Sequence, residues 1–555
     1  MNDETLDGAL RVSGNIVDLV AMEVFPGTLV LQRGRIAQIL REPSAQYSTY
    51  LIPGFVDAHV HVESSMLPPA EMARLVLPFG TVAVVADPHE IANVLGAEGI
   101  AYMLDSAAKS PLLFHFGAPS CVPATPFETA GAELSVASVE ALLDDPRIGF
   151  LSEVMNFPGV LAGDPSVLAK IRAAKARGKR VDGHAPGLRG DAARRYASAG
   201  IETDHECGDL EEANEKIAAG MSIALREGSA AKNLDALLPL LKNHADRCFF
   251  CTDDAHPDDL ARGHIDALAR RAIAAGYDVL TVLRVACRNA VQHYGLSVGQ
   301  LQVSDSADFL VVSDLVSLCV LRTFVRGELV AERGKCLLPF TAAARVNRFL
   351  LETLLVPEAF FIPARGEQVR VLVAKDGSLF TTESQEKPTI LDGRVVADPS
   401  RDLLLLTVVN RYQQTKPAVA LVRGFGLRRG AIASSVAHDS HNIVAVGADE
   451  TSLCRAVNAI IAEKGGLSLV DGEETRVLPL PIAGLMSDQE GHVAAQQYAR
   501  LSQYAQNALG SPLGAPFMTL SFMALLVIPR LKLGDLGLFC GDTFQFVDLF
   551  VAASA

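Results

Sequence analysis

The hydrophobic pattern from residue 52 to residue 254 alternates short apolar, β-favouring runs with amphipathic segments. Each run ends in polar residues, which indicates a buried strand that leads into a loop. The intervening segments place apolar residues at helical spacing, as in residues 165–178. The pattern predicts strands at residues 55–61, 81–87, 112–118, 149–154, 180–184, 201–205, 221–226 and 248–253. Eight alternating strand and helix units predict a parallel (β/α)8 barrel, whose active site lies at the carboxyl ends of its strands.

The rest of the chain carries other patterns. Residues 1–50 and 300–340 show short alternating runs with turn signals, which predict strands. Residues 280–294 predict a helix, and residues 355–555 alternate strands with helices near 453–463 and 493–506, which predicts an α+β domain. The apolar run 517–528 is too short to span a bilayer and favours a core strand.

Composition narrows the function classes. With 555 residues, 49% hydrophobic and 20% charged, the chain has the composition of a soluble globular protein. A net charge of −15 argues against nucleic acid or an anionic membrane as partner, because both need a basic surface, and it suits a small neutral or cationic substrate. Residues 1–5 lack a secretory signal, and nine cysteines scattered through apolar segments fit a reducing compartment. We therefore expect a cytoplasmic protein.

Candidate chemistry gathers at the predicted strand ends. His59 and His61 project to the same side of the first strand, about 7 Å apart, because side chains alternate along a strand. A lone His-x-His pair more often reflects packing than metal binding. The later strand ends supply its partners, which are Asp87, His89, Glu90, Glu153, His184, His205, Glu206, Arg226, Glu227, Asp253 and Asp254.

Six of these residues form a candidate metal-ligand set. They are His59, His61, Glu153, His184, His205 and Asp253. Imidazole nitrogens and carboxylate oxygens suit two divalent metals, with Glu153 able to bridge them, and such sites accept Mn, Fe or Zn. A metal pair lowers the pKa of a shared water toward neutrality and polarises an electrophile. The set therefore predicts metal-assisted hydrolysis.

The order of these ligands along the barrel resembles the amidohydrolase superfamily. Most binuclear members have a carboxylated lysine on strand four, whereas this chain has Glu153. That departure, together with the motifs Val85-Ala-Asp-Pro-His-Glu-Ile-Ala-Asn93, Asp182-Gly-His-Ala-Pro-Gly187 and Ala433-Ser-Ser-Val-Ala-His-Asp-Ser-His-Asn442, resembles the adenine deaminase branch. The similarity extends over nearly the whole chain.

The resemblance implies both a domain plan and a reaction. Residues 1–50 and 300–340 are expected to form one small β-sandwich beside a barrel of residues 51–299 and a C-terminal domain of residues 355–555. The implied reaction is hydrolytic deamination of adenine to hypoxanthine and ammonia in purine salvage. A metal-activated hydroxide attacks C6, and Asp253 passes its proton to the leaving amine.

The residues at the strand ends also indicate binding roles. We expect two divalent ions per chain, with Mn or Fe ahead of Zn, and a homo-oligomer, in the form of a dimer. Glu227 and Ser229 are expected to hydrogen-bond the purine edge. Asp87, His89 and Glu90 are expected either to line the pocket or to hold an additional metal.

Other functions are weighed against this one. Hydrolysis of a cyclic amide, as in dihydropyrimidinases and hydantoinases, uses the same metal chemistry, but the missing strand-four lysine argues against it. A non-enzymatic scaffold would have lost ligands, and none is lost. Single-zinc deaminases follow His-x-Glu with Pro-Cys-x-x-Cys. His61-Val-Glu63 matches the first half only, and Cys248 and Cys251 lie in a strand-like run without the proline.

The motif that contains His438, Asp439 and His441 is polar in an apolar neighbourhood. Its spacing does not put all three side chains on one face, which favours a structural or mouth-lining role over a second metal site. We expect this C-terminal region to pack near the barrel mouth and help close the pocket against water.

Overall fold

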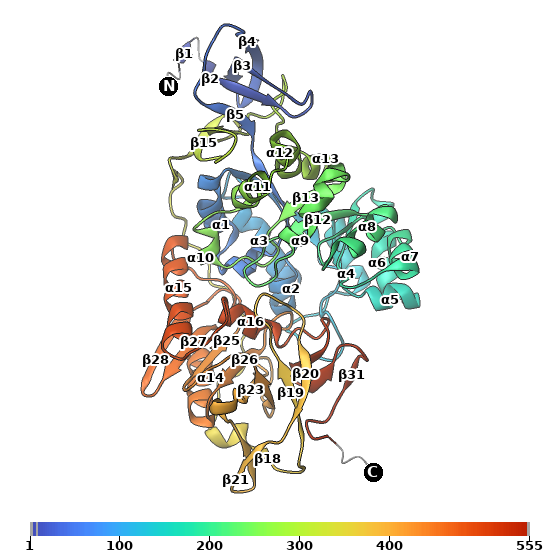
Figure 1. The fold of residues 1–555 in the computed structure, drawn as a ribbon, viewed down its shortest axis with the longest axis vertical. Coiled ribbons are helices and arrows are strands. Elements are labelled where there is room, and N and C mark those ends of the chain that lie inside the picture. Colours follow the sequence, from blue (N-terminus) through green and yellow to red (C-terminus); the bar gives the residue numbers. More distant parts are fainter. Residues whose placement is uncertain (1–3, 7–8, 552–555) are drawn as a thin grey trace.

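The computed structural model describes residues 4–6 and 9–551; part of the amino-terminal stretch considered above, residues 1–3, lies outside them, as do residues 7–8 and 552–555. Parallel strands form the centre of the molecule (Figure 1). They are β6 (Phe55–Val60), β7 (Thr81–Ala86), β8 (Leu113–Ala118), β9 (Ile148–Val154), β10 (Arg180–Gly183), β11 (Thr203–Asp204), β12 (Ser222–Arg226) and β13 (Cys248–Cys251). All eight strands predicted from the apolar runs are confirmed, with bounds that shift by one or two residues at most ends.

The strands close into a barrel through backbone hydrogen bonds at two seams. Between the last strand and the first, the Asp253 amide donates to the His59 carbonyl at 2.9 Å and the His61 amide donates to the Asp253 carbonyl at 3.0 Å. Between β10 and β11, the Glu202 amide donates to the Val181 carbonyl at 2.9 Å. The predicted (β/α)8 fold is therefore confirmed.

Helices surround the barrel (Figure 1). They are α1 (Pro69–Val76), α2 (His89–Leu95), α3 (Ala97–Ala107), α4 (Val136–Asp144), α5 (Phe157–Ala162), α6 (Pro165–Ala176), α7 (Gly190–Ser198), α8 (Leu210–Ala218), α9 (Leu234–Leu237), α10 (Pro257–Leu260), α11 (Ile265–Ala274), α12 (Val279–Cys287) and α13 (Asn289–Tyr294). The sequence predicted one helix over residues 280–294, and the structure divides it into α12 and α13. The Asn289 amide group donates to the carbonyls of Ala245 and Cys248 at 2.6 and 2.8 Å, which anchors the start of α13 to β13.

The segments that flank the barrel pair with each other, as expected. They contribute β1 (Glu4–Leu6), β2 (Ala9–Asp18), β3 (Glu23–Gln32), β4 (Arg35–Arg41), β5 (Tyr50–Pro53), β14 (Phe309–Val312), β15 (Val320–Val325), β16 (Glu328–Glu332) and β17 (Lys335–Cys336). Strand β5 runs antiparallel to β14, with Ile52 opposite Leu310, and this pairing joins the two segments into one nine-stranded sheet. The domain boundaries drawn from the sequence stay predictions.

The C-terminal region is built on an eight-stranded sheet in the order β20-β19-β24-β23-β26-β25-β27-β28. Its elements are β18 (Ile362–Pro363), β19 (Val369–Val373), β20 (Thr382–Glu386), β21 (Thr389–Leu391), β22 (Arg394–Val396), β23 (Leu404–Val409), β24 (Ala418–Arg423), β25 (Ala431–Ser434), β26 (Ile443–Gly447), α14 (Glu450–Glu463), β27 (Gly466–Asp471), β28 (Glu474–Pro479), α15 (Gly491–Asn507), α16 (Pro516–Phe522), β29 (Leu531–Gly534), β30 (Gly537–Cys540) and β31 (Gln545–Phe546).

The core strand predicted for residues 517–528 is wrong, because this run forms α16 and the turns after it. Pro516 occupies the first helical position, where its fixed φ favours a helix. Every residue of α16 is buried, so the sequence shows no polar face, and a fully buried helix cannot be distinguished from a buried strand by periodicity.

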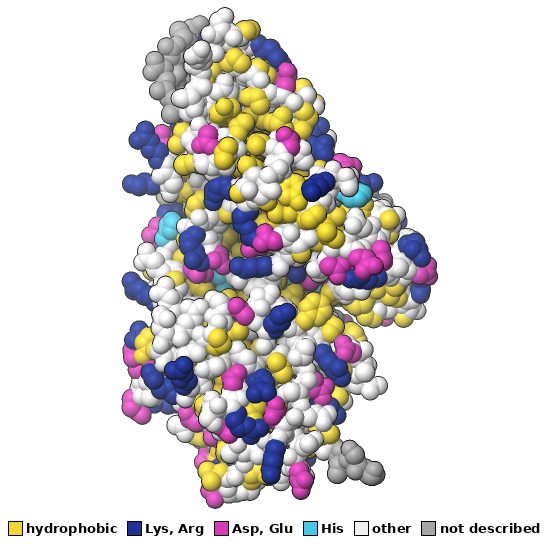
Figure 2. Space-filling model, in the orientation of Figure 1, with side chains coloured by type: hydrophobic (Ala, Val, Ile, Leu, Met, Phe, Trp, Pro, Cys, Tyr) yellow, Lys and Arg dark blue, Asp and Glu magenta, His cyan; other side chains and the backbone are white. Residues whose placement is uncertain are grey.

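The barrel lies between the nine-stranded sheet at one end and the C-terminal region at the other (Figure 1). The Ser487 amide donates to the Met66 carbonyl at 2.8 Å, just beyond the carboxyl end of β6, so the C-terminal region packs on the strand ends. Charges of both signs are interspersed over the face shown in Figure 2. None of the helices in the described part of the chain has the length and apolar character needed to cross a membrane.

Candidate metal centre and active site

Histidines and carboxylates from five strands meet at the carboxyl end of the barrel. Asp253 follows β13, and its Oδ1 lies 3.3 Å from His59 Nε2 and 3.1 Å from His61 Nε2. Its backbone is fixed by the two hydrogen bonds that close the barrel, and it adopts a left-handed φ of 55°. The His-x-His pair and Asp253 therefore come together as the strand pattern predicted.

Glu153, at the end of β9, faces two groups of histidines. Its Oε1 lies 3.5 Å from His61 Nε2. Its Oε2 lies 2.9 Å from His184 Nδ1 and 3.2 Å from His205 Nε2. Oε1 thus faces His61, whereas Oε2 faces His184 and His205 and lies 3.9 Å from His59 Nε2, an arrangement that lets a single carboxylate contact two ions.

Burial and charge act against each other in this cluster. Burial alone would raise the pKa of the Glu153 carboxyl, but His184 and His205 hold it well below its ordinary value. Burial alone would likewise lower the pKa of His184, but Glu153 and Glu206 raise it to about 9. Glu153 and His184 therefore keep each other charged, and a cation that binds His184 displaces its proton.

Arg226, at the end of β12, contacts two carboxylates of the cluster. Its Nη1 donates to Asp253 Oδ2 at 2.7 Å, and its guanidinium also contacts both oxygens of Glu206. Burial would raise the pKa of Asp253, whereas Arg226 and nearby histidines hold it well below its usual range. The guanidinium thus keeps Asp253 anionic and leaves its Oδ1 facing His59 and His61.

Replacing Arg226 by Met is expected to lower the free energy of unfolding by about 3–5 kcal/mol, because two buried carboxylates lose their partner. The measurement is the denaturant midpoint of the cooperative transition. The matched control is Arg262→Met, since Arg262 is 69% exposed and its ion pairs are worth about 1 kcal/mol or less. Equal midpoints for the two variants would show that the buried cluster does not need Arg226.

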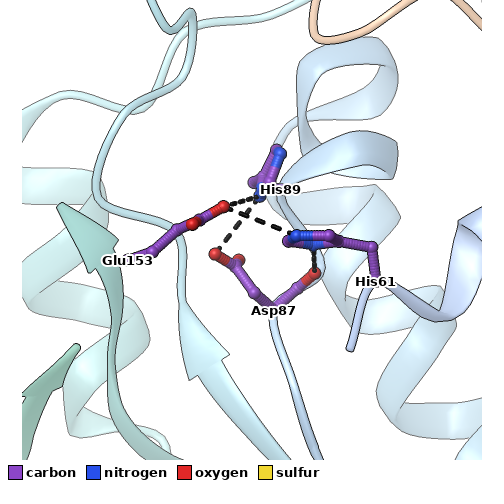
Figure 3. Close-up of side chains that lie close together, drawn as sticks. All are labelled: His61, Asp87, His89 and Glu153. Carbon is purple, nitrogen blue, oxygen red and sulfur yellow. Dashed lines mark hydrogen bonds and ion pairs between the residues drawn. The ribbon is translucent and has the colours of Figure 1, made fainter. Parts of the chain in front are cut away.

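A second cluster lies beside the first (Figure 3). Asp87 follows β7 and His89 begins α2; His89 Nδ1 lies 3.2 Å from Asp87 Oδ2 and 3.5 Å from Glu153 Oε1. The ring of His89 points between the Asp87 and Glu153 carboxylates, while His61 contacts both residues from the other side. Asp87 and His89 therefore border the first cluster directly.

The C-terminal region contributes to this second cluster. His438 Nδ1 contacts Glu90 Oε1, and His441 Nε2 contacts Glu90 Oε2. Asp439 Oδ1 lies 3.6 Å from His89 Nε2. The prediction that this motif packs at the barrel mouth is confirmed.

A small cavity of about 20 Å³ lies between the two clusters. Its polar lining includes His61, His89, Glu90, Glu153, His184, Glu206, Asp253, Asp254, His438 and Asp439. Met155 from the barrel and Leu379 and Leu525 from the C-terminal region are its apolar lining residues. Lys532 fixes these C-terminal segments, since its Nζ donates to the carbonyls of Leu379 and Phe522 at 2.7 and 2.9 Å.

Comparison with known proteins relates this geometry to a family. The sequence matches the amidohydrolase family over residues 50–330 and the adenine deaminase C-terminal domain over residues 378–545. It is 57% identical over 548 residues to the adenine deaminase of Salinibacter ruber, covering 98% of this chain and 100% of that protein. The chain belongs to the adenine deaminase family. It is also 54% identical to the family member from Sulfurovum sp. and 47% identical to that from Methanosarcina mazei, each with 97% of this chain and 99% of the relative covered.

Amidohydrolases are metal-dependent, and the donors present here fit divalent ions. The residues form several groups of three or more buried His, Asp and Glu whose ligand atoms lie within 4.8 Å of one another. Among the described residues, no hydrogen bond reaches the buried Nε2 atoms of His59, His184 and His205. Buried polar atoms are otherwise almost always paired, so these nitrogens are available as metal ligands.

Two residues expected to bind the substrate do not line the cavity. Glu227 Oε1 pairs with Arg271 at 2.5 Å and faces an outer pocket beside α11. Ser229 Oγ donates to Asp259 Oδ2 and accepts from the His256 amide. Both follow β12, but the chain turns outward after Arg226, because the Glu227 amide donates to the Cys251 carbonyl and the Ser229 amide donates to the Asp254 carbonyl.

Several residues that line or support the site had no role predicted from the sequence. For Glu206, Arg226 and Asp254 the sequence did indicate a place near the site, because each lies at a predicted strand end. Nothing in the sequence indicated that Leu379 and Leu525 line the cavity, because apolar residues of a separate region look like ordinary core residues there.

Proposed function

We propose that the protein deaminates adenine hydrolytically to hypoxanthine and ammonia, in purine salvage, using two divalent ions held by His59, His61, Glu153, His184, His205 and Asp253. The metal assignment rests on the position of the Glu153 carboxylate. Its two oxygens face different histidines at 2.9–3.5 Å. The relatives support adenine as the substrate, and they do not favour a cyclic amide. Mn and Fe are our first candidates for the metal, followed by Zn.

The reaction transfers protons as well as forming a bond. A bound metal pair supplies Lewis acidity and lowers the pKa of water. Asp253 takes the proton of the attacking water through Oδ1, while Arg226 holds its Oδ2 at 2.7 Å. As the C6–N bond breaks, Asp253 returns this proton to the leaving amine, and the proton of the added hydroxyl passes to N1, so adenine and water give hypoxanthine and ammonia.

The lining of this small cavity offers a flat base both apolar surface and hydrogen-bonding groups. Met155, Leu379 and Leu525 offer apolar surface to the ring, and Asp254 and the free Nε2 of His438 face the same space, 3.8 Å apart, as candidates to hydrogen-bond ring nitrogens. The Ser64 hydroxyl holds Asp254 Oδ1 at 2.5 Å. Because the site lies under the C-terminal region, bulk water is excluded from the reacting carbon.

Ammonia release tests the proposal. Metal-free protein reconstituted with Mn²⁺, Fe²⁺ or Zn²⁺ is incubated with adenine, adenosine, cytosine and dihydrouracil. We expect adenine to give equal amounts of ammonia and hypoxanthine, and we expect a chelator to abolish turnover until metal is restored. Ring opening of dihydrouracil without release of ammonia from adenine would assign the site to cyclic amides instead. Light scattering tests the predicted dimer, and the cytoplasmic location stays a prediction.

A further inference from the structure

The second cluster contains four buried carboxylates. Asp87, Glu90, Asp254 and Asp439 are all at least 93% buried. No arginine or lysine forms an ion pair with them within the described part of the chain, whereas Arg226 is engaged by Glu206 and Asp253. Their partners are instead His89, His438 and His441, and proteins stabilise buried carboxylates either by such partners or by a bound metal.

Three of the residues converge on one point. His89 Nε2 lies 3.5 Å from Glu90 Oε1 and 3.6 Å from Asp439 Oδ1. Atoms that bind a common ion at about 2.0–2.2 Å in tetrahedral geometry stand roughly 3.3–3.6 Å apart, so the observed spacing is that of a metal's ligands. We propose that His89, Glu90 and Asp439 bind a further divalent cation at the junction of the barrel and the C-terminal region.

The surroundings of these residues support a built site. A histidine ligand usually directs its second nitrogen at a carboxylate, and His89 Nδ1 faces Asp87 Oδ2 at 3.2 Å. His438 and His441 contact the two oxygens of Glu90 and fix its orientation. Asp439 Oδ2 is buried and makes no hydrogen bond to any described residue, so this carboxylate still has an oxygen available to a ligand.

The site is separate from the proposed metal pair. His89 directs Nδ1 toward Glu153 and Nε2 toward Asp439, so the two ligand sets lie on opposite edges of one ring. One nitrogen and two carboxylate oxygens suit Mn²⁺, Fe²⁺ or Zn²⁺ better than Mg²⁺ or Ca²⁺, which prefer oxygen ligands alone. With ligands from residues 89, 90 and 439, the ion ties the C-terminal region to the barrel.

The ion also has a consequence for the pocket. Glu90 Oε1 contacts His438 Nδ1, and the other nitrogen of His438 faces the cavity near Asp254. Fixing Glu90 therefore fixes the direction in which His438 presents Nε2 to a bound base. This step rests on the proposed function, whereas the existence of the site does not.

Metal stoichiometry tests the site without reference to activity. Metal-free full-length protein is saturated with Mn²⁺, desalted and analysed for bound metal. We expect three ions per chain for the wild type and two for Asp439→Asn, which keeps the size of the side chain but removes its charge. The matched control is Glu71→Gln, a buried carboxylate whose oxygens contact Arg74 and the Gly491 amide, and it should keep three ions.

A second measurement is independent of any variant. Anomalous diffraction of Mn²⁺-soaked wild-type crystals should show a peak between His89 Nε2 and Asp439 Oδ1, apart from the peaks at Glu153. Two ions per chain in the wild type, or three retained by Asp439→Asn, would overturn the further site. If adenine is still deaminated in that case, the proposed function stands without it.

Discussion

Replacing Asp253 by Asn is expected to lower the turnover of adenine by about 10³-fold, within the range of 10²–10⁴ that a positioned acid and base contributes. The amide of Asn cannot take a proton from water or return one to the amine. It can still offer an oxygen toward His59 and His61, so we expect bound metal to match the wild type at saturating Mn²⁺. Turnover and metal content are measured on the same preparation.

The backbone conformation of Asp253 determines which substitution tests its chemistry without disturbing the chain. Its φ of 55° lies in the left-handed region, which Asn adopts more readily than Ala, and its amide and carbonyl close the barrel at both sides. Asp253→Asn therefore keeps the backbone conformation, whereas Asp253→Ala would add backbone strain to the lost chemistry. A matched control is Asp402→Asn, since Asp402 has a φ of 53° and its side chain accepts hydrogen bonds from the Gly424 and Gly426 amides.

Asp402→Asn should turn over adenine at the wild-type rate. If Asp253→Asn stays within tenfold of the wild type with full metal content, another group must carry the proton. Asp254 would then be the next candidate, because it lines the same cavity.

The barrel and its first cluster could be predicted because their signals are local. Each strand is a short apolar run, and the alternation of strand and helix fixes where the carboxyl ends meet. His59 and Asp253 lie 194 positions apart in the sequence, yet one architecture places both at the same rim. The residues at strand ends therefore needed no further information to be assembled.

The parts that escaped prediction depend on how regions pack. Glu90 contacts His438 and His441, which lie roughly 350 positions later in the sequence. Neither segment has a sequence feature that predicts contact with the other. Glu227 follows a barrel strand, as Asp253 does, but loop hydrogen bonds turn it away to Arg271. In residues 517–528, burial on all sides removed the periodicity that would have identified α16.

Replacing Glu153 by Gln is expected to remove one metal ion per chain and to lower turnover by more than about 10²-fold. Partners that merely orient a ligand cost 10–100-fold when they are lost, so a residue whose own two oxygens face separate histidine groups should cost more. Gln keeps the shape of the side chain but has one oxygen, and its NH₂ group cannot bind a cation. Either His61 or the pair His184 and His205 would then lose a shared carboxylate oxygen.

Metal analysis and steady-state turnover of Glu153→Gln are compared with those of Glu71→Gln. Glu71 is also a buried barrel carboxylate, but its oxygens contact Arg74 and the Gly491 amide and none of the histidines. Glu71→Gln should therefore keep the full metal content even if stability falls. Glu153→Asp tests whether the negative charge alone is enough. The Asp side chain keeps the carboxylate but is one methylene shorter, so we expect this variant to lose the ion as well. Unchanged metal content in both Glu153 variants would mean that Glu153 bridges nothing and that strand four only lines the pocket.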